Sequence, residues 1–230
     1  MLVVNPAYKA ITEAWFDPAR WGDRAQPVSA GGRGSAWFVG TDQGDMVLRH
    51  YRRGGLVARV SERNYVYTGW RNTRSYREFQ LLRELHDQGL PVPEPVAACA
   101  NRRWMWYHAA ILIRRIPGAV PFPEVGNLHD EALWAKVGKT IRRFHNAGLD
   151  HVDLNCDNIL LKGGDVYLID LDRCRLRGES GGSRWEKGNL DRLWRSVEKR
   201  IRPVTERQTP ILWDCLLAGY YRPLESIGAS

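Results

Sequence analysis

The residues most able to do chemistry lie between His151 and Asp170. Asp153 stands two residues after His151 and five residues before Asn158, and an apolar run then leads to Asp170. Phosphoryl transfer to a hydroxyl needs a carboxylate that accepts the hydroxyl proton and oxygen ligands that hold Mg²⁺ against the triphosphate. The spacing therefore predicts Asp153 as the catalytic base, Asn158 and Asp170 as magnesium ligands, and ATP as the phosphoryl donor.

The residues around this loop predict how it is positioned. Gly148 follows a helical pattern and predicts a left-handed helix end just before the loop. The apolar run at 159–161 predicts the first strand of a hairpin. His151 is expected to support the loop through a hydrogen bond to the backbone, because no Cys or His stands near it at zinc-ligand spacing. A solvated polar loop between a helix and a hairpin is the alternative.

This combination resembles the catalytic core of the protein-kinase-like superfamily. The resemblance implies an α+β fold with two lobes, in which the N-lobe is an antiparallel sheet with one helix and the reduced C-lobe is mainly helical. The chain departs from protein kinases in two places: Asn155 stands where they carry lysine, and Leu171-Asp172 replaces their Phe-Gly. It also lacks their A-P-E segment. A small molecule or glycolipid is therefore expected as the acceptor, not a protein.

The hydrophobic pattern divides the chain into an N-lobe at 1–116 and a C-lobe at 117–230, together one kinase-like domain with a break at Pro117-Gly118. Residues 1–24 are expected to form an irregular arm or short helix, and residues 52–71 a loop. Strands are expected near 26–30, 36–39, 46–51, 96–100 and 106–114, and helices near 75–89, 133–144, 190–201 and 210–221.

The N-lobe is predicted to bind the nucleotide. Gly31, Gly32 and Gly34 would let backbone N–H groups approach the phosphates, although such a cluster also fits a plain hairpin turn. The backbone at Arg115 and Ile116 is expected to hydrogen-bond the adenine.

Arg49 lies on the third predicted strand, where most of the superfamily carries lysine, and it is predicted to contact the phosphates. Glu78 is expected to hold Arg49 in place, with Glu84 as the alternative partner. However, Ser75 and Glu78 also have the spacing of a helix capping box.

Charge is concentrated in one part of the chain. The net charge is +8, and residues 47–77 contain many arginines but only one acidic residue, Glu62. Such a cluster could face nucleic acid, anionic lipid or a multiply charged acceptor, or it could be a solvated basic surface. No stretch is apolar enough for a transmembrane helix, no signal peptide is apparent, and four scattered cysteines fit a reducing cytosol.

Several further strings are similar to the 3-deoxy-D-manno-octulosonic acid (Kdo) kinase family of the lipopolysaccharide kinase group. They begin at Leu48, Thr73, Glu78, Gly89, His151 and Asp170, and read LRHYRRGG, TRS, EF, GLPVP, HVDLN and DLDRC. The resemblance implies ATP-dependent phosphorylation of the 4-hydroxyl of Kdo on a Kdo-bearing lipid A precursor. It also implies a peripheral position at the cytoplasmic face of the bacterial inner membrane.

The arginine-rich loop suits such an acceptor, which carries carboxylate, phosphate and acyl groups. Its aromatic residues Tyr51, Tyr65, Tyr67 and Trp70 are expected to face the lipid surface. Tentative acceptor-binding residues are Arg52, Arg53, Arg59 and Arg63. Neither nucleic acid nor an obligate protein partner is expected. The alternatives are a kinase of another small sugar or antibiotic, and a nucleic-acid-binding or inactive kinase-like module.

Overall fold

The computed structural model describes residues 1–28, 35–51, 65–178 and 184–222, which form two compact units. The first unit comprises Met1–Gln88 and Pro93–Pro117, and the second comprises Gly89–Val92 and Gly118–Ser230. Segment 89–92 belongs with the second unit because the Pro91 carbonyl accepts a hydrogen bond from Leu168 N at 3.1 Å.

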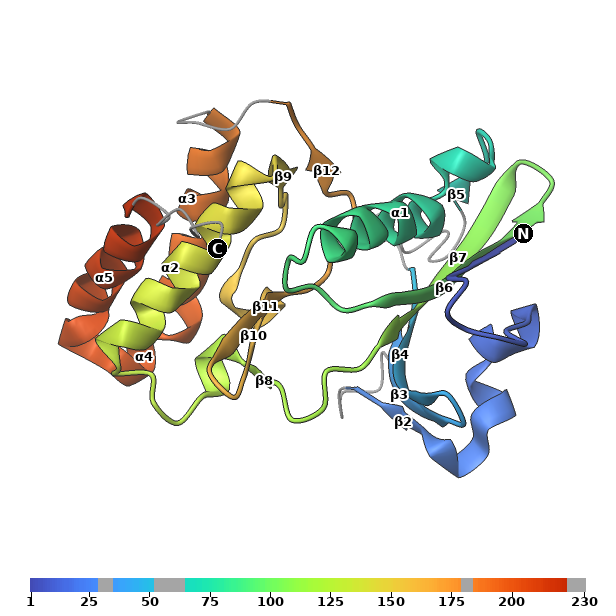
Figure 1. Ribbon diagram of the computed structural model, residues 1–230, viewed down its shortest axis with the longest axis horizontal. Coiled ribbons are helices and arrows are strands. Elements are labelled where there is room, and N and C mark those ends of the chain that lie inside the picture. Colours follow the sequence, from blue (N-terminus) through green and yellow to red (C-terminus); the bar gives the residue numbers. More distant parts are fainter. Residues whose placement is uncertain (29–34, 52–64, 179–183, 223–230) are drawn as a thin grey trace, which may run out of the picture. The chain divides into compact units, whose positions relative to one another are not determined.

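The first unit is built on an antiparallel sheet (Figure 1). Its strands follow the order β1 (Leu2–Val4), β6 (Pro95–Arg103), β7 (Trp106–Arg114), β4 (Gly44–His50), β3 (Ala36–Thr41) and β2 (Ala25–Pro27), and β5 (Tyr65–Val66) also pairs with β7. The helix α1 (Arg74–Asp87) packs on β6 and β7. The predicted antiparallel sheet with one α-helix is therefore confirmed for the described residues.

Two of these strands correct the expectations from sequence. The arm at 1–24 contains β1, which pairs with β6 through partners such as Val3 and Ala98. The predicted loop at 52–71 contains β5, whose Tyr65 lies opposite Tyr107. Both strands are too short to show an alternating hydrophobic pattern in the sequence. Each is stabilised by pairing with a long neighbouring strand.

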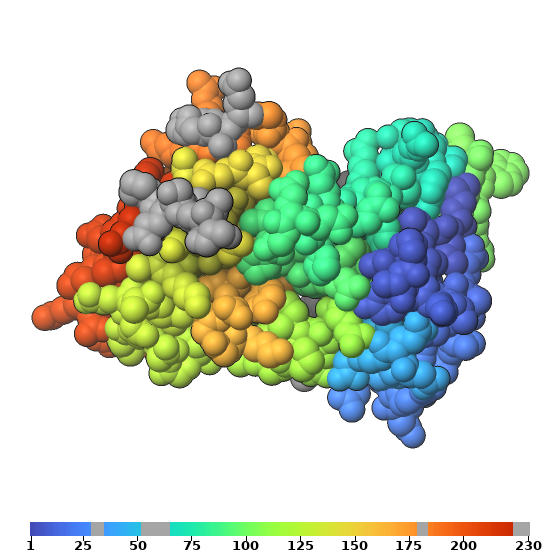
Figure 2. All heavy atoms as spheres, in the orientation of Figure 1, coloured from blue at the N-terminus to red at the C-terminus, as the bar shows by residue number. Residues whose placement is uncertain are grey.

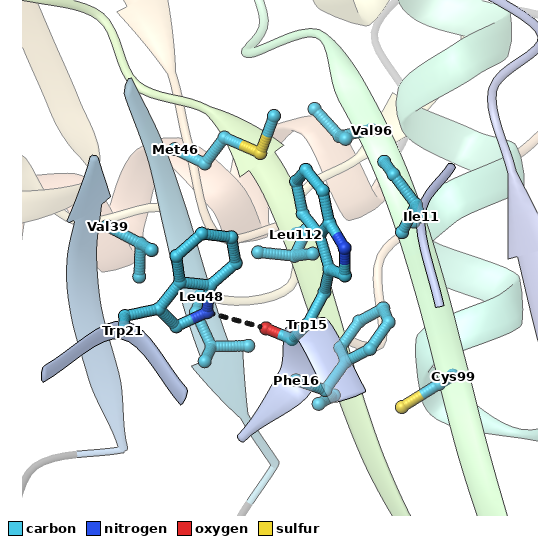
Figure 3. Packing of buried hydrophobic residues seen from close by; sticks show 12 residues of the cluster. Ile11, Trp15, Phe16, Trp21, Val39, Met46, Leu48, Val96, Cys99 and Leu112 are labelled. Atoms are coloured by element: carbon cyan, nitrogen blue, oxygen red, sulfur yellow. Dashed lines mark hydrogen bonds between the residues drawn. The ribbon is translucent and has the colours of Figure 1, made fainter. Parts of the chain in front are cut away.

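The rest of the N-terminal arm closes one face of the sheet. The short 3-10 helices η1 (Glu13–Phe16) and η2 (Pro18–Arg24) bring Trp15, Phe16 and Trp21 against buried sheet residues (Figure 3). The Trp21 indole N–H donates to the Trp15 carbonyl at 3.0 Å, so its polar atom is satisfied within the core. Burial of these large rings makes the arm a structural part of the first unit.

The second unit contains α2 (Glu131–Asn146), α3 (Arg184–Arg200), α4 (Arg202–Thr205) and α5 (Thr209–Tyr221). Short strands accompany them: β10 (Ile159–Lys162) pairs with β8 (Val120–Pro121) and β11 (Asp165–Leu168), and β9 (Leu149–Asp150) pairs with β12 (Arg175–Leu176). The unit also contains the 3-10 helices η5 (Phe122–Glu124) and η7 (Glu206–Gln208). The expected hairpin after the loop is β10–β11. The third helix starts at Arg184, earlier than the predicted start near 190.

Helices α2 and α5 lie side by side in Figure 1 and touch through their backbones. A Cβ added to Gly138 of α2 would lie 1.9 Å from the Leu216 carbonyl oxygen, and one added to Gly219 of α5 would lie 2.0 Å from the Ala135 carbonyl oxygen. Glycine at both positions therefore permits this close packing. It fixes the helix that leads into the catalytic loop.

Candidate active site

The catalytic loop starts at a tight junction after α2. Gly148 has φ +82°, which confirms the predicted left-handed helix end. A Cβ at this position would also lie 2.2 Å from the Arg177 carbonyl oxygen. The Gly148 carbonyl accepts a hydrogen bond from Arg177 N at 2.8 Å, so the chain near β12 holds the entry to the loop.

Within the loop, side-chain amides hold the backbone around Asp153. Asn155 caps the 3-10 helix η6 (Cys156–Asn158), its Oδ1 accepting from Asp157 N at 3.0 Å and Asn158 N at 3.1 Å. The Nδ2 atoms of Asn155 and Asn158 both donate to the Asp153 carbonyl, at 3.1 and 3.0 Å. The Asp153 side chain is 56% exposed, so its carboxylate can meet a substrate hydroxyl.

Ile169 joins this loop to Asp170. Its N–H donates to the Asn158 carbonyl at 3.1 Å, and its carbonyl accepts from His151 Nε2 at 3.1 Å. Asp170 then adopts φ +59°, a left-handed conformation that aspartate tolerates better than most residues. These contacts confirm that His151 supports the loop by a backbone hydrogen bond. They also hold the backbones of Asp153, Asn158 and Asp170 in one connected network.

The surroundings of His151 favour a neutral ring. Burial lowers the pKa of His151, while the hydrogen bond to the Ile169 carbonyl and the charges of Asp170 and Asp153 oppose that shift. The ring is therefore neutral near pH 7, with the proton on Nε2. Its buried Nδ1 has no hydrogen-bond partner among the described residues. His151 thus acts as a fixed hydrogen-bond donor and not as a proton acceptor.

The oxygen donors at this loop fit Mg²⁺. Asn158 Nδ2 donates to the Asp153 carbonyl, which leaves Oδ1 as the atom that could face a metal. No described group donates a hydrogen bond to that oxygen. Mg²⁺ commonly takes one or two protein oxygens and completes its shell with phosphates and water. Asn158 and Asp170 suit that role, and the described chain holds no cluster of three His, Cys, Asp or Glu that offers another.

Helix α3 supplies supports that sequence reasoning missed. Asn189 donates to Asp150 Oδ1 at 3.1 Å and accepts from His151 N at 2.9 Å. Burial raises the pKa of Asp150, but hydrogen bonds from Arg177 and Asn189 outweigh it and lower the pKa below its ordinary value. Asp150 is therefore an ionised group that helps to fix the start of the loop. No local motif marks Asn189, which lies far from the loop in sequence.

Two arginines of α3 also reach the loop. Arg200 donates from Nε and Nη2 to the Asp157 carboxylate, with the shortest contact at 2.9 Å. Arg192 Nη1 lies 3.9 Å from Asp153 Oδ1. The candidate base therefore has a cation beside it that sequence reasoning did not identify.

In the first unit, the structure confirms the expected ion pair between Arg49 and Glu78. Arg49 Nη2 donates to both Glu78 carboxylate oxygens, and the Tyr51 hydroxyl donates to the same carboxylate. Strand alternation explains the contact, because Leu48 points into the cluster under η1 and η2 and Arg49 points to the opposite face, toward α1. The Glu78 side chain is only 3% exposed, so the ion pair belongs to the interior of the first unit and is not a loose surface contact.

The predicted capping box is wrong. Helix α1 begins at Arg74 with Thr73 as its N-cap, so Ser75 already lies inside the helix. The Ser75 hydroxyl donates to the Cys99 carbonyl at 2.8 Å instead. Glu78 is therefore not used as a capping residue and is available to Arg49.

The remaining predicted site residues divide into described and undescribed positions. Arg115 N donates to the Asp45 carbonyl at 3.0 Å, so this N–H is already engaged and only the Arg115 carbonyl and the Ile116 backbone remain for an adenine. Seven predicted residues lie outside the described residues: Gly31, Gly32, Gly34, Arg52, Arg53, Arg59 and Arg63.

The aromatic residues expected to face lipid are partly misassigned. Tyr51 is 4% exposed and Tyr65 is 8% exposed, so both belong to the interior. Tyr65 stacks beside Tyr107, with ring centroids 5.4 Å apart. Tyr67 and Trp70 are partly exposed. A run of arginines and tyrosines in sequence therefore did not distinguish packing tyrosines from surface tyrosines.

Known proteins and a family model with similar sequences carry the names of kinases. The family model described as "Lipopolysaccharide kinase (Kdo/WaaP) family" matches residues 18–220. A protein of Xylella fastidiosa (strain M12), named 3-deoxy-D-manno-octulosonic acid kinase, is 50% identical over 187 residues, which cover 80% of this chain and 74% of that protein.

Solved structures with similar folds are kinases with low sequence identity. A structure described as "WaaP in complex with acyl carrier protein" matches with a TM-score of 0.58 and 19% identity, covering 97% of this chain and 90% of that chain. An aminoglycoside-3'-phosphotransferase of type VIII matches with a TM-score of 0.56 and 15% identity, covering 85% of this chain and 84% of that chain. These likenesses confirm the predicted protein-kinase-like fold.

Proposed function

Because this chain belongs to the lipopolysaccharide kinase (Kdo/WaaP) family and is a phosphotransferase, we propose that it phosphorylates the 4-hydroxyl of Kdo on a Kdo-bearing lipid A precursor, with ATP as donor. The observation that carries the proposal is the network joining His151, Asn158 and Ile169. That network links the backbone of the proposed base Asp153 with the backbones of Asn158 and Ile169, next to Asp170, and so supports the proposal.

Asp153 is the proposed catalytic base. It accepts the proton of the Kdo hydroxyl as the hydroxyl oxygen forms a bond to the γ-phosphorus and the bond from that phosphorus to ADP breaks. Asn158 Oδ1 and the Asp170 carboxylate would hold Mg²⁺, which when bound neutralises charge on the β and γ phosphates. The network around the Asp153 carbonyl keeps the base in place without using its carboxylate.

Arg49 is the proposed phosphate-binding cation of the first unit. Glu78 and Tyr51 restrict its position, so less conformational freedom is lost when a phosphate binds. The glycine cluster at 31–34 and the backbone at Arg115 and Ile116 remain proposed contacts of the phosphates and the adenine. Arg52, Arg53, Arg59 and Arg63 remain proposed contacts of the acceptor.

We place the reaction at the cytoplasmic face of the bacterial inner membrane, where a Kdo-bearing lipid acceptor would be met. None of the helices in the described ranges is long and apolar enough to span a bilayer. We propose peripheral attachment because the chain is basic, with a net charge of +8, and can be attracted to an anionic membrane surface.

The decisive experiment offers labelled ATP and Mg²⁺ with separate acceptors. These are a Kdo-bearing lipid A precursor, lipid A without Kdo, an aminoglycoside and a generic protein. Label is expected only in the Kdo-bearing acceptor, and NMR of the product should place the phosphate on the 4-oxygen. Faster labelling of the aminoglycoside, or equal labelling of lipid A without Kdo, would contradict the proposed acceptor.

The role of Asp153 has its own test. Asp153→Asn keeps the shape of the side chain but cannot accept the hydroxyl proton, so turnover should fall about 100-fold or more. Asp157→Asn is the matched control, because Asp157 lies in the same loop and pairs with Arg200 instead of facing the substrate. Equal losses in both variants would remove Asp153 from the role of base.

A further inference from the structure

The turn between β6 and β7 exposes large apolar side chains. Trp104 is 90% exposed, Met105 66% and Trp106 38%. Figure 1 shows this turn extending beyond the neighbouring strands, and in Figure 2 its light green atoms stand out at the edge of the first unit. Most tryptophan side chains in folded proteins are largely buried, so an almost fully exposed one at a projecting tip needs a reason.

Turn chemistry does not provide that reason. Arg103 and Trp106 are the last paired residues, so Trp104 and Met105 form a two-residue hairpin turn. Trp104 has φ +57°, a conformation in which glycine, asparagine or aspartate is favoured. Tryptophan at this position is therefore unfavourable for the backbone and contributes almost nothing to the core. Neither backbone conformation nor core packing within the described residues therefore accounts for a tryptophan here.

Neighbouring residues extend the apolar surface. Val66 of β5 is 55% exposed and lies opposite Trp106 in the sheet register. Tyr67 N donates to the Met105 carbonyl at 2.8 Å, which fixes the strand end beside the turn. These contacts make the tip a rigid part of the sheet, so its side chains are presented at little entropic cost.

The strands that form the tip carry charge of one sign. Arg102 and Arg103 are exposed directly before the turn, and Arg102 lies 4.6 Å from the Tyr67 ring centroid while its Nε donates to the Trp104 carbonyl at 2.8 Å. No Asp or Glu occurs at 95–114 or at 65–77. The surface therefore combines an apolar tip with cations immediately behind it.

We propose that the β6–β7 turn anchors the protein on an anionic lipid bilayer. Trp104 and Met105 would enter the region between the headgroups and the acyl chains, where tryptophan is favoured, and Arg102 and Arg103 would lie at the level of the phosphates. A narrow projecting tip can insert between lipid headgroups. It is less suited to a protein partner, because protein interfaces are broad and closely matched in shape. The proposal rests on the proposed function for its biological setting, because it names how the enzyme meets a membrane-bound acceptor.

Vesicle flotation of the full chain tests the anchor without any catalytic step. Vesicles of phosphatidylethanolamine with phosphatidylglycerol are compared with vesicles of phosphatidylcholine alone, for the unmodified chain and for Trp104→Gly with Met105→Asn. The double variant should bind anionic vesicles about tenfold more weakly, since two apolar side chains no longer enter the bilayer. Glycine adopts φ +57° more readily than tryptophan, so the melting temperature of the double variant should not fall below that of the unmodified chain.

Matched variants separate the tip from general surface effects. Ile211→Asn removes an apolar side chain that is 55% exposed on α5 and should leave vesicle binding unchanged. Arg103→Glu should weaken binding to anionic vesicles more than Arg83→Glu, which reverses another exposed arginine of the first unit on α1.

The outcomes distinguish the anchor from the proposed function. Unchanged vesicle binding by the double variant, or equal losses in the two control variants, would overturn the anchor. In the expected result, the double variant retains turnover of a detergent-dispersed Kdo acceptor and loses turnover mainly when that acceptor is in vesicles. If the unmodified chain phosphorylates no Kdo acceptor, the proposed function is wrong. The vesicle-binding results test the anchor independently of that outcome.

Discussion

Arg192 and Asp153 lie close enough to influence one another but too far apart for a hydrogen bond. Their nearest atoms are 3.9 Å apart, and the side chains are 46% and 56% exposed. An exposed pair of this kind adds little to stability, so Arg192 is free to serve a bound ligand. The acceptor proposed here carries a sugar carboxylate, which a guanidinium can bind through two parallel hydrogen bonds.

We therefore expect Arg192→Gln to raise the acceptor KM about tenfold while the ATP KM and the melting temperature stay near those of the unmodified chain. Steady-state kinetics with each substrate varied in turn measures the difference. Arg195→Gln is a control from the same helix, since Arg195 is exposed and forms no ion pair with the described part of the catalytic loop. A parallel rise in the KM for ATP would contradict a role confined to the acceptor.

Arg49 makes a different prediction, because its partner is buried. Arg49→Ala removes the cation beside a carboxylate that is 3% exposed, and such a loss destabilises a protein by about 3 kcal/mol. The same change should raise the KM for ATP more than that for the acceptor. Glu78→Gln should be less damaging to the fold, because an amide needs no counter-charge. An unchanged KM for ATP in Arg49→Ala would exclude Arg49 from the phosphate site.

At the scale of secondary structure, the backbone contact between α2 and α5 is the most sensitive packing feature. Gly138→Ala would place a methyl group 1.9 Å from the Leu216 carbonyl oxygen, so the helices must separate. Overpacking of this kind typically costs about 1–3 kcal/mol, and more where backbone blocks the new atom. Urea unfolding should show a correspondingly lower midpoint.

The control is a glycine with open space. Gly188 lies inside α3, and a Cβ there meets nothing within 4 Å. Gly188→Ala should stabilise the chain by about 0.5–1 kcal/mol through helix propensity alone. A neutral or stabilising Gly138→Ala would show that the two helices can separate without loss.

The elements predicted from sequence were those with long, regular hydrophobic patterns. The strands leading to His50 and Arg114, and the helix ending at Asn146, have enough alternating or helical repeats to be recognised. The strands β1 and β5 are too short for such a repeat and depend on pairing with β6 and β7. Tertiary contacts, not local pattern, define them.

The same reasoning explains the candidate site. His151, Asp153 and Asn158 stand close together in the chain, so their spacing was sufficient to predict a shared role. Asn189 and Arg192 come from a helix remote in sequence, and no spacing rule connects them to the loop. The contact between Glu78 and Arg49 was predicted correctly, and strand alternation explains it by fixing the face of Arg49. The capping box was wrong because the helix begins before Ser75.

At the scale of the molecule, stability should depend on pH through a buried histidine. Burial lowers the pKa of His145 from 6.5 to about 4, although the charge of Glu186 opposes the shift and that of Arg142 favours it. Below pH 6.5 the unfolded chain binds a proton that the folded chain refuses, so stability falls as pH decreases toward 4. The loss is about 3 kcal/mol over that range.

Thermal melts between pH 7 and pH 4 measure this effect. His145→Gln should reduce the acid loss without abolishing it, because the pKa values of His151 and Asp150 are also lowered. Glutamine also retains a partner for the Tyr220 hydroxyl, which lies 2.7 Å from His145 Nδ1. His86→Gln is the control, because His86 is exposed on α1. An equally steep acid loss in His145→Gln would assign the effect to other groups.

The arginine at position 49 also determines which chemical reagents can report on this enzyme. Nucleotide analogues that tag kinases by acylating an amine beside the phosphates require a lysine there, and this chain contains none from residue 10 to residue 135. Such analogues should leave the first unit unmarked even while they compete with ATP. Activity-based profiling that relies on lysine capture would therefore overlook an active kinase of this type, whereas guanidinium-directed dicarbonyl reagents would find it.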